Sequence, residues 1–222
     1  MRLALFDLDG TLLPIDSDHA FGEFMVRIGW ADPQEHQRRN DAFYADYQAG
    51  TLDVHAYIDF ATAAWRDRSP AQQQAARERF LAEVIAPRLL EPARALVHRH
   101  RQAGDLLAIV TSTNEFVTAP IAQALGIDEL LATELERDAA GRVTGRIRGV
   151  PALREGKVER VQAWLAARGS ALERCESSTY YGDSTNDLPL LERVTHPVAT
   201  NPGPALAHIA AERGWPVLRL FA

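Results

Sequence analysis

The strongest constraint on the fold is a regular alternation of strand and helix patterns from about residue 92 onward. Short apolar runs predict strands at residues 2–8, 106–110, 178–181, 197–200 and 215–220. Helical spacing predicts helices at residues 92–102, 115–125, 157–168, 187–193 and 204–212. Such alternation is typical of parallel strands whose connecting helices cover both faces of a sheet. The predicted fold is therefore an α/β protein with a Rossmann-like, doubly wound parallel sheet.

A block of different character separates the first strand from this pattern. Residues 16–87 carry helical apolar stripes and no convincing strand; the stripes are Phe21, Phe24, Met25 and Ile28, and Tyr57, Phe60, Ala61 and Ala64. We therefore predict a core domain of residues 1–15 and 88–222, with a helical domain of residues 16–87 inserted after the first strand. Two turn glycines within residues 141–147 indicate a small hairpin in the core.

Composition and charge limit the possible partners. The net charge is -6, whereas nucleic-acid backbones are bound by clustered Lys and Arg, so no nucleic-acid partner is predicted. No apolar segment reaches membrane-spanning length, and the first apolar run is interrupted by Asp7 and Asp9, which argues against a signal peptide. Cys175 is the only cysteine, which excludes an intramolecular disulfide. We expect a cytoplasmic protein without a membrane partner, and the oligomeric state stays open.

Acidic side chains follow two of the predicted strands. Asp7 and Asp9 come at the end of the first strand, and Asp183 and Asp187 follow the strand at residues 178–181. Because the carboxyl ends of parallel strands meet at one edge of a sheet, these acids are expected to lie together. Clustered carboxylates repel each other, and a divalent cation would offset that repulsion; ligands that are all oxygen suit Mg²⁺. Alternatively, each acid is an ordinary turn or helix-capping residue.

Polar residues near the same edge could bind an anion. Thr111 and Ser112 follow the strand at residues 106–110, just before a helix whose first N–H groups could hold phosphate. Lys157 lies in the first turn of a predicted helix, where the helix dipole disfavours a cation that does not face an anion. Helix capping and a solvated surface lysine are the alternatives. With the acids, these groups predict phosphoryl transfer, in which one carboxylate attacks phosphorus and another protonates the leaving oxygen.

In the order and spacing of four motifs, the chain resembles the haloacid dehalogenase superfamily of phosphatases. The motifs are Asp7-Leu8-Asp9-Gly10-Thr11, Thr111, Lys157 and Gly182-Asp183-Ser184-Thr185-Asn186-Asp187. The helical block after the first motif corresponds to the cap domain that this superfamily often carries there. A helical cap together with the last motif is similar to the phosphoserine-phosphatase-like branch.

The resemblance implies a magnesium-dependent phosphatase that hydrolyses a small-molecule phosphomonoester. Asp7 would be the nucleophile that becomes an aspartyl-phosphate, and Asp9 would be the general acid and base. Mg²⁺ would be bound by Asp7, by the backbone carbonyl of Asp9 and by Asp183.

The remaining motif residues have supporting roles in this resemblance. Thr111 and Lys157 would hold the phosphoryl group. Asp187 would support either the metal site or Lys157, and Asn186 would lie behind the groups that contact the metal.

The second motif departs from the family at a place that bears on the substrate. Typical phosphoserine phosphatases have Ser-Gly-Gly there, whereas this chain has Thr111-Ser112-Thr113. The glycines allow the backbone to approach the substrate closely, and here Ser112 would contact it instead. This difference argues against a simple transfer of phosphoserine as the substrate.

The segment Asp16-Ser17-Asp18-His19 is the second indication of the substrate. Asp16 falls near the position of an acid that reads the substrate amino group in the family, and some relatives with this segment use histidinol phosphate. Asp16, Asp18 and His19 are therefore candidates for binding an amino-bearing phosphomonoester, such as histidinol phosphate or phosphoserine. The alternative is a helix N-cap at Asp16 or Ser17.

Two other classes of protein use similar residues. A signalling receiver domain also clusters aspartates, a Thr or Ser and a Lys around magnesium, but its phospho-acceptor lies on a middle strand and it needs no helical insertion. A catalytically silent binding module of the same fold would be indicated by loss of Asp7 or Asp9, and both are present. Magnesium-dependent turnover of a generic phosphate ester separates the three classes.

Overall fold

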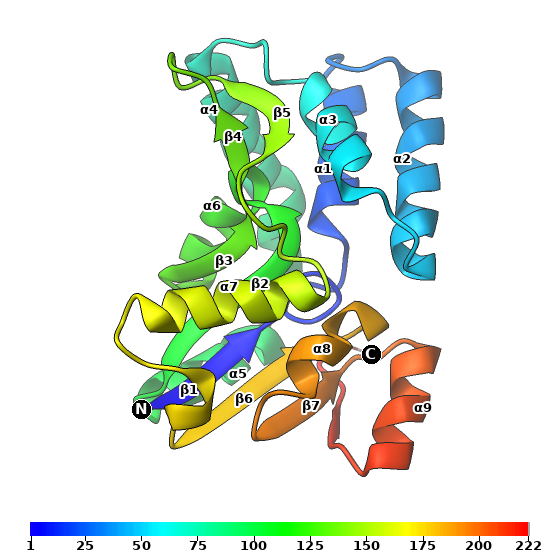
Figure 1. Ribbon diagram of the computed structural model, residues 1–222. Helices are drawn as coiled ribbons and strands as arrows, with labels where there is room; N and C mark the ends of the chain where they lie inside the picture. Colours follow the sequence, from blue (N-terminus) through cyan, green and yellow to red (C-terminus); the bar gives the residue numbers. More distant parts are fainter. Residues whose placement is uncertain (222) are drawn as a thin grey trace.

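The computed structural model describes residues 1–221, which are organised around one central parallel sheet (Figure 1). Its strand order is β3-β2-β1-β6-β7-β8, and neighbouring strands pair in parallel. The strands are β1 (Arg2–Phe6), β2 (Leu106–Asn114), β3 (Glu129–Thr133), β6 (Ser177–Gly182), β7 (His196–Thr200) and β8 (Val217–Leu218). The chain winds from β1 outward to β3 on one side and to β8 on the other, so the predicted doubly wound α/β fold is confirmed.

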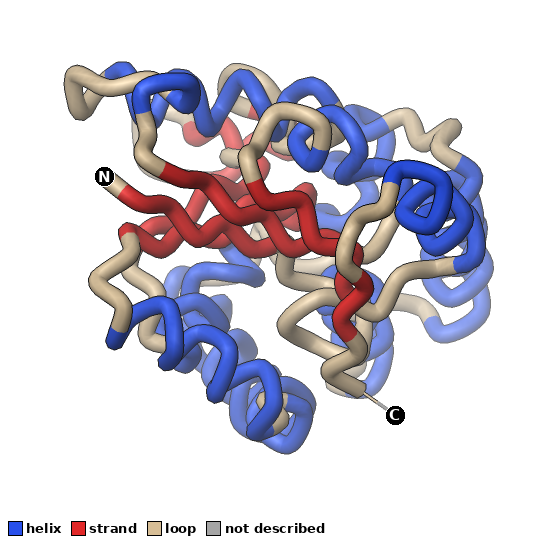
Figure 2. The backbone as a smooth tube through the Cα atoms, turned by 90° about the horizontal axis from the view of Figure 1, so that it is seen from below, coloured by secondary structure: helices blue, strands red, loops and turns tan. Residues whose placement is uncertain are grey.

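Helices cover both faces of the sheet (Figure 2). They are α5 (Glu91–Gln102), α6 (Glu115–Leu125), α7 (Glu155–Ala166), α8 (Leu188–Leu191) and α9 (Pro204–Arg213), with the 3-10 turns η3 (Leu172–Arg174) and η4 (Thr185–Asp187). Ala4 and Phe6 of β1 pack in the same apolar cluster as α5 and α6, whereas Leu3 and Leu5 pack with α7, α8 and α9. Burial on both faces explains why β1 reads as an uninterrupted apolar run. Within the described chain, no helix combines the length and the apolar character needed to cross a membrane.

The helices that precede α5 form a block beyond the carboxyl ends of the strands (Figure 1). They are α1 (Ser17–Arg27), α2 (Pro33–Ala49), α3 (Val54–Ala63) and α4 (Pro70–Phe80), followed by the π-helical turn η1 (Leu81–Ile85) and the 3-10 turn η2 (Ala86–Arg88). Residues 17–88 are all described and contain no strand, as predicted. The side chains of Asp16, Asp32, Asp53 and Ser69 cap α1 to α4 by accepting backbone N–H groups.

The predicted hairpin is present, and it lies apart from the main sheet. It pairs β4 (Leu135–Arg137) with β5 (Val143–Ile147) in antiparallel fashion. The hairpin packs against α3 of the helical block (Figure 1). The sequence analysis assigns the hairpin to the core domain, so this contact connects the core to the helices inserted after β1.

Two strands differ from the sequence prediction. The edge strand β3 was not predicted, because Glu129, Leu130, Leu131 and Ala132 favour helices by intrinsic propensity, and its pairing with β2 overrides that preference. The strand β2 continues to Asn114 and does not end at Val110. Its register with β3 shifts between Thr111 and Asn114, so an irregular strand carries the second motif.

Candidate active site

Asp7 follows β1 directly and is buried at the carboxyl edge of the sheet. Its backbone N–H donates to the carbonyl of Tyr181 on the neighbouring strand β6 at 2.8 Å, which fixes the start of the turn. Gly10 in this turn has φ +74°, and a Cβ atom there would lie 2.3 Å from a carboxylate oxygen of Asp183. The glycine therefore lets the first and the last motif approach each other.

Lys157 lies fully buried on α7 between the two acidic motifs. Its ammonium donates to Asp7 Oδ1 at 2.8 Å, to Asp187 Oδ1 at 2.6 Å and to the hydroxyl of Tyr180 at 3.1 Å. Burial alone would lower the pKa of Lys157, but the adjacent carboxylates of Asp187 and Asp7 keep that pKa well above its usual value. The ammonium is thus a fixed positive charge beside Asp7.

Asp187 uses both carboxylate oxygens to hold its surroundings. Oδ1 accepts from Lys157 and from the Tyr180 hydroxyl, while Oδ2 accepts from the backbone N–H groups of Asp183 at 3.1 Å and Ser184 at 3.2 Å. A Cβ atom at Gly182 would lie 2.7 Å from the Asp187 side chain. Asp187 therefore positions both the lysine and the loop that carries Asp183.

The carboxylates of Asp7, Asp183 and Asp187 form a group that could hold a metal ion. One oxygen of each lies within 4.8 Å of the others. Burial raises the pKa of Asp7 to about 7, and burial followed by repulsion from Asp7 raises the pKa of Asp183 well above its usual value. A divalent cation fits this donor set, because the three carboxylates carry more negative charge than the single ammonium of Lys157 can balance. Asp7 and Asp183 are the better ligands, since both oxygens of Asp187 are already engaged.

The carboxylate of Asp9 points away from Lys157, toward α1 and β2. Oδ1 accepts from the backbone N–H of Ser17 at 2.9 Å, and Oδ2 accepts from the hydroxyl of Thr113 at 2.9 Å. Burial raises the pKa of Asp9 well above its usual value, and the nearby Asp16 and Asp7 raise it further. A raised pKa favours the protonated form of the carboxyl group, which is the form that a general acid needs.

The hydroxyl residues of the second motif lie within β2, not beyond its end. Thr111 is buried, and its Oγ1 accepts from the backbone N–H of Thr113 at 3.3 Å. Ser112 faces the helical block, where its hydroxyl lies 3.5 Å from the hydroxyl of Tyr47. Asn114 caps α6 by accepting from Val117 N, so capping does not account for Thr111 and Ser112.

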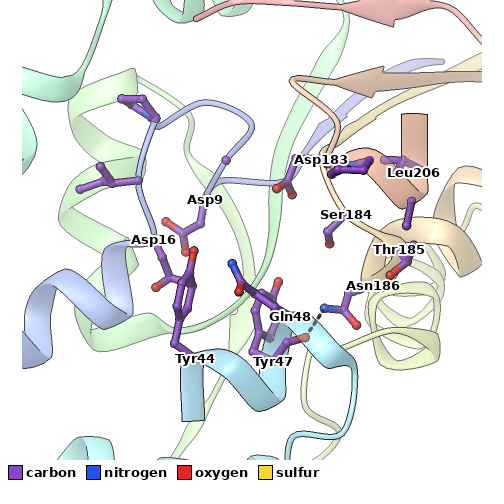
Figure 3. A pocket seen from close by; sticks show the side chains of 16 residues that line it. Asp9, Asp16, Tyr44, Tyr47, Gln48, Asp183, Ser184, Thr185, Asn186 and Leu206 are labelled. Atoms are coloured by element: carbon purple, nitrogen blue, oxygen red, sulfur yellow. Dashed lines mark hydrogen bonds between the residues drawn. The ribbon is translucent and has the colours of Figure 1, made fainter. Parts of the chain in front are cut away.

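Helix α2 contributes side chains to the site that the sequence analysis did not identify. Figure 3 shows Tyr44, Tyr47 and Gln48 extending from α2 toward Asp9, Asp16 and Asp183. They line a cavity of about 460 Å³ together with the two acidic motifs. Tyr44 and Tyr47 are three residues apart, a spacing that places them on one helix face, but nothing in the sequence indicates that this face meets the sheet.

The candidate substrate residues lie at or near this cavity. Asp16 caps α1, because its Oδ1 accepts from His19 N at 2.8 Å, and it also lines the cavity. Asp18, two residues further along α1, is buried and accepts from the Asn114 amide at 3.3 Å. The imidazole of His19 lies 2.9 Å from the Asp41 carboxylate. The capping alternative is therefore correct for Asp16, and it coexists with exposure of Asp16 to the cavity.

A polar contact region joins the helical block to the core beside the site. The side chain of Asn186 donates to the carbonyl of Tyr47 at 3.3 Å, and Figure 3 shows this bond as a dashed line. Arg154 donates from Nε to Asn186 Oδ1 at 3.1 Å, and its other nitrogen donates to the carbonyl of Gly50. Arg154 has φ +52°, an uncommon conformation for a residue other than glycine. No motif or periodicity in the sequence indicates this role for Arg154.

This contact region makes Gly50→Ala a specific test. Gly50 has φ +73°, and an added Cβ would lie 2.1 Å from the Arg154 guanidinium. Gly29 has φ +75° with nothing within 4 Å, so Gly29→Ala is a matched control. Both variants should lose about 1 kcal/mol of stability from left-handed backbone strain. Only Gly50→Ala should also raise KM, and equal kinetics for the two variants would contradict a role for the contact.

The chain matches a known protein family and known relatives along most of its length. The family model of the haloacid dehalogenase-like hydrolases matches residues 4–192. A histidinol-phosphatase from Neisseria meningitidis serogroup C (strain 8013) is 43% identical over 217 residues, which cover 98% of each chain. The match to the family model spans the acidic motifs, Thr111 and Lys157.

Solved structures agree in fold. A Bordetella pertussis Tohama I protein of unknown function has a TM-score of 0.93 with 50% identity, and the match covers 99% of both chains. A phosphoserine phosphatase, solved as an analogue of its phospho-aspartyl intermediate, has a TM-score of 0.67 with 18% identity, over 99% of this chain and 93% of that one. The chain therefore belongs to the haloacid dehalogenase-like hydrolases, in their phosphoserine-phosphatase-like branch, and is a phosphatase.

Proposed function

We propose that this phosphatase hydrolyses an amino-bearing phosphomonoester through an aspartyl-phosphate on Asp7, with Mg²⁺ as the metal. The observation that carries the proposal is the buried ammonium of Lys157, 2.8 Å from Asp7 Oδ1 and 2.6 Å from Asp187 Oδ1. This ammonium would stabilise the negative charge on the phosphoryl oxygens while the carboxylate of Asp7 attacks phosphorus. Mg²⁺ bound by Asp7, Asp183 and the Asp9 carbonyl would supply the further positive charge that the transferring oxygens require.

The chain's own residues would perform two successive displacements. An oxygen of Asp7 forms a bond to phosphorus while the bond from phosphorus to the leaving oxygen breaks, and Asp9 gives its proton to that oxygen. Asp9 then takes a proton from a water molecule whose oxygen forms a bond to phosphorus, while the bond from phosphorus to the Asp7 oxygen breaks; inorganic phosphate leaves and the Asp7 carboxylate is regenerated. Thr111 and Lys157 would hold the phosphoryl oxygens during both steps, and Asp187 would keep Lys157 in place.

The helical block would act as the cap that encloses the substrate. We assign the cap to residues 16–87 and the core to residues 1–15 and 88–222. Tyr44 and Tyr47 of α2 line the cavity that is also lined by Asp9 and Asp183. This supports a core that carries the acidic groups and a cap that covers them. A closed cap would exclude bulk water and present side chains to the leaving half of the substrate, which Ser112 of β2 would contact from the core.

The substrate proposal rests on the acids near the start of α1 and on the relative. Asp16 lies at the cavity, where it could pair with a substrate ammonium. The Neisseria relative at 43% identity is a histidinol-phosphatase, and a relative from Mycobacterium tuberculosis (strain ATCC 25618 / H37Rv) that is 32% identical over 217 residues is a phosphoserine phosphatase. Histidinol phosphate and phosphoserine both carry an amino group, so the class is an amino-bearing phosphomonoester.

Removal of the metal ligand tests the proposal. Asp183→Ala should raise the Mg²⁺ concentration that gives half-maximal hydrolysis of p-nitrophenyl phosphate by more than about tenfold, because one charged ligand is lost. Calcium should inhibit, since its looser coordination would occupy the attacking oxygen of Asp7. Asp67→Ala, at an exposed acid, is the control. Full turnover in excess chelator would refute the proposal, and absence of any turnover would favour the receiver or silent module.

A further inference from the structure

The side chain of Tyr47 reaches from α2 of the helical block to the second motif of the core. Its hydroxyl lies 3.5 Å from that of Ser112, the residue that follows Thr111 on β2. Tyr47 also lines the active-site cavity together with Asp9 and Asp183, and Figure 3 shows it extending toward these acids. A hydroxyl of the helical block therefore lies beside the residues that would hold the phosphoryl group.

We propose that Tyr47 is a further catalytic residue, whose hydroxyl donates a hydrogen bond to an oxygen of the transferring phosphoryl group. The inference rests on the proposed phosphatase function and deepens it, because the helical block would then supply a part of the phosphoryl site and not only cover it. The role is independent of the leaving half of the substrate, since every phosphomonoester carries the same phosphoryl group.

The Tyr47 hydroxyl has a proton to donate. Within residues 1–221, its one hydrogen bond is the long contact in which the Ser112 hydroxyl donates to the phenol oxygen. A tyrosine hydroxyl both donates and accepts, so this contact leaves the phenol proton without an acceptor. The hydroxyl of Tyr180 differs, because it contacts both Lys157 and Asp187. A phosphoryl oxygen would give the Tyr47 proton the partner that the protein does not provide.

The charges that act on the Tyr47 hydroxyl are those of the catalytic network. Burial raises the pKa of this phenol well above its usual value. The ammonium of Lys157 opposes that rise, whereas the carboxylates of Asp7 and Asp187 add to it. Coulomb interactions weaken with distance, so the phenol lies near the position where Asp7 would attack phosphorus. Its raised pKa keeps the phenol protonated near neutral pH, which makes it a donor and not a base.

The core fixes the end of α2 that carries Tyr47. The side-chain amide of Asn186 donates to the Tyr47 carbonyl at 3.3 Å, and Asn186 belongs to the same motif as Asp183. Arg154 donates to Asn186 Oδ1 at 3.1 Å and also to the carbonyl of Gly50, just after α2. The phenol is therefore held relative to the loop that carries a metal ligand. A donor fixed in advance stabilises the charge that develops on a phosphoryl oxygen without a cost of reorganisation.

Tyr47→Phe tests the proposal, because it removes the hydroxyl and keeps the ring. We expect kcat to fall at least about tenfold for both histidinol phosphate and p-nitrophenyl phosphate, since both displacements act on the shared phosphoryl group. KM should change less than kcat. Asp46→Ala, at the exposed neighbouring residue of α2, is the control and should leave both substrates unchanged.

Two outcomes of these kinetics would overturn the proposal. A loss of less than about twofold for both substrates would show that Tyr47 only packs against the core. A loss confined to one substrate would show that the hydroxyl contacts the leaving half. The measurements are made well below the thermal unfolding midpoints of both proteins, so that a modest loss of stability in Tyr47→Phe does not affect the comparison.

Inhibition by orthovanadate provides a readout without turnover. Bound vanadate adopts the trigonal bipyramidal geometry of attack on phosphorus, so the hydroxyl should contact one of its oxygens. Tyr47→Phe should raise the inhibition constant of vanadate at least about tenfold, and an unchanged constant would overturn the proposal. Failure of the proposed function is distinguishable, because the wild-type enzyme itself would then show no metal-dependent turnover of p-nitrophenyl phosphate.

Discussion

Asp7→Asn should abolish turnover, with a fall in kcat of at least about a thousandfold, because the amide cannot form the aspartyl-phosphate. The loss should be the same for histidinol phosphate and for p-nitrophenyl phosphate, since the nucleophile acts on the phosphoryl group that both share. Steady-state kinetics with saturating Mg²⁺ measure it. Hydrolysis near the wild-type rate would show that Asp7 is not the nucleophile.

The same variant should stay folded. Asp7→Asn removes one of the two carboxylates beside Lys157, and Asp187 remains 2.6 Å from the ammonium. The amide oxygen can still accept from Lys157, so the buried charge keeps a partner. Circular dichroism and a thermal melt close to those of the wild type are the required control, and a collapsed melt would make the kinetic loss uninformative about the nucleophile.

Lys157→Met should cause the largest loss of stability. The substitution keeps much of the side-chain volume but leaves the carboxylates of Asp7 and Asp187 buried without the ammonium that bridges them. Breaking a buried ion pair by removing one partner costs about 3–5 kcal/mol, a large fraction of the stability of an ordinary domain. Urea unfolding monitored by tryptophan fluorescence measures the change. A loss below about 1 kcal/mol would contradict the central place of this network.

Lys157→Arg is the matched control for charge. Lys157 is the only lysine in the chain; the other 23 residues in the Lys+Arg total of 24 are arginines. A compact ammonium directs its donors to Asp7, Asp187 and Tyr180, and a planar guanidinium cannot reproduce that arrangement in a fully buried site. Lys157→Arg should therefore recover part of the stability but little activity. Full activity would show that positive charge alone suffices.

The sequence was sufficient to predict every strand of the main sheet except β3, and the sheet edge at which the acidic motifs lie. Parallel strands end at a common edge, and Asp7, Thr111 and Asp183 each lie at or just beyond the end of a predicted strand. Because this argument needs only chain order and topology, it did not depend on exact strand ends. Although β2 ends at Asn114 and not at Val110, Thr111 still lies on the strand that pairs with β1, near the end of that pairing.

The docking of the helical block could not be predicted in the same way. Tyr57 belongs to a predicted helical stripe, and periodicity shows that such a face is buried but not against what, whereas Tyr44 and Tyr47 belong to neither stripe. Arg154 donates to the backbone carbonyl of Gly50, about a hundred positions away. Because every residue has a backbone carbonyl, no sequence pattern indicates which one a side chain will contact. The sequence leaves Asp16 as either a helix cap or a substrate-binding residue. In the structure Asp16 caps α1 through Oδ1, and its side chain also lines the cavity.

The most direct test of the account is chemical trapping of the covalent intermediate. The enzyme is mixed with histidinol phosphate and Mg²⁺, quenched in acid and treated with borohydride, which reduces an aspartyl-phosphate to homoserine. Peptide mass spectrometry then locates the modified position. The account predicts modification at Asp7 alone, dependent on substrate and absent from Asp7→Asn. Modification at Asp9 or Asp183, or none despite continuing turnover, would contradict Asp7 as the nucleophile.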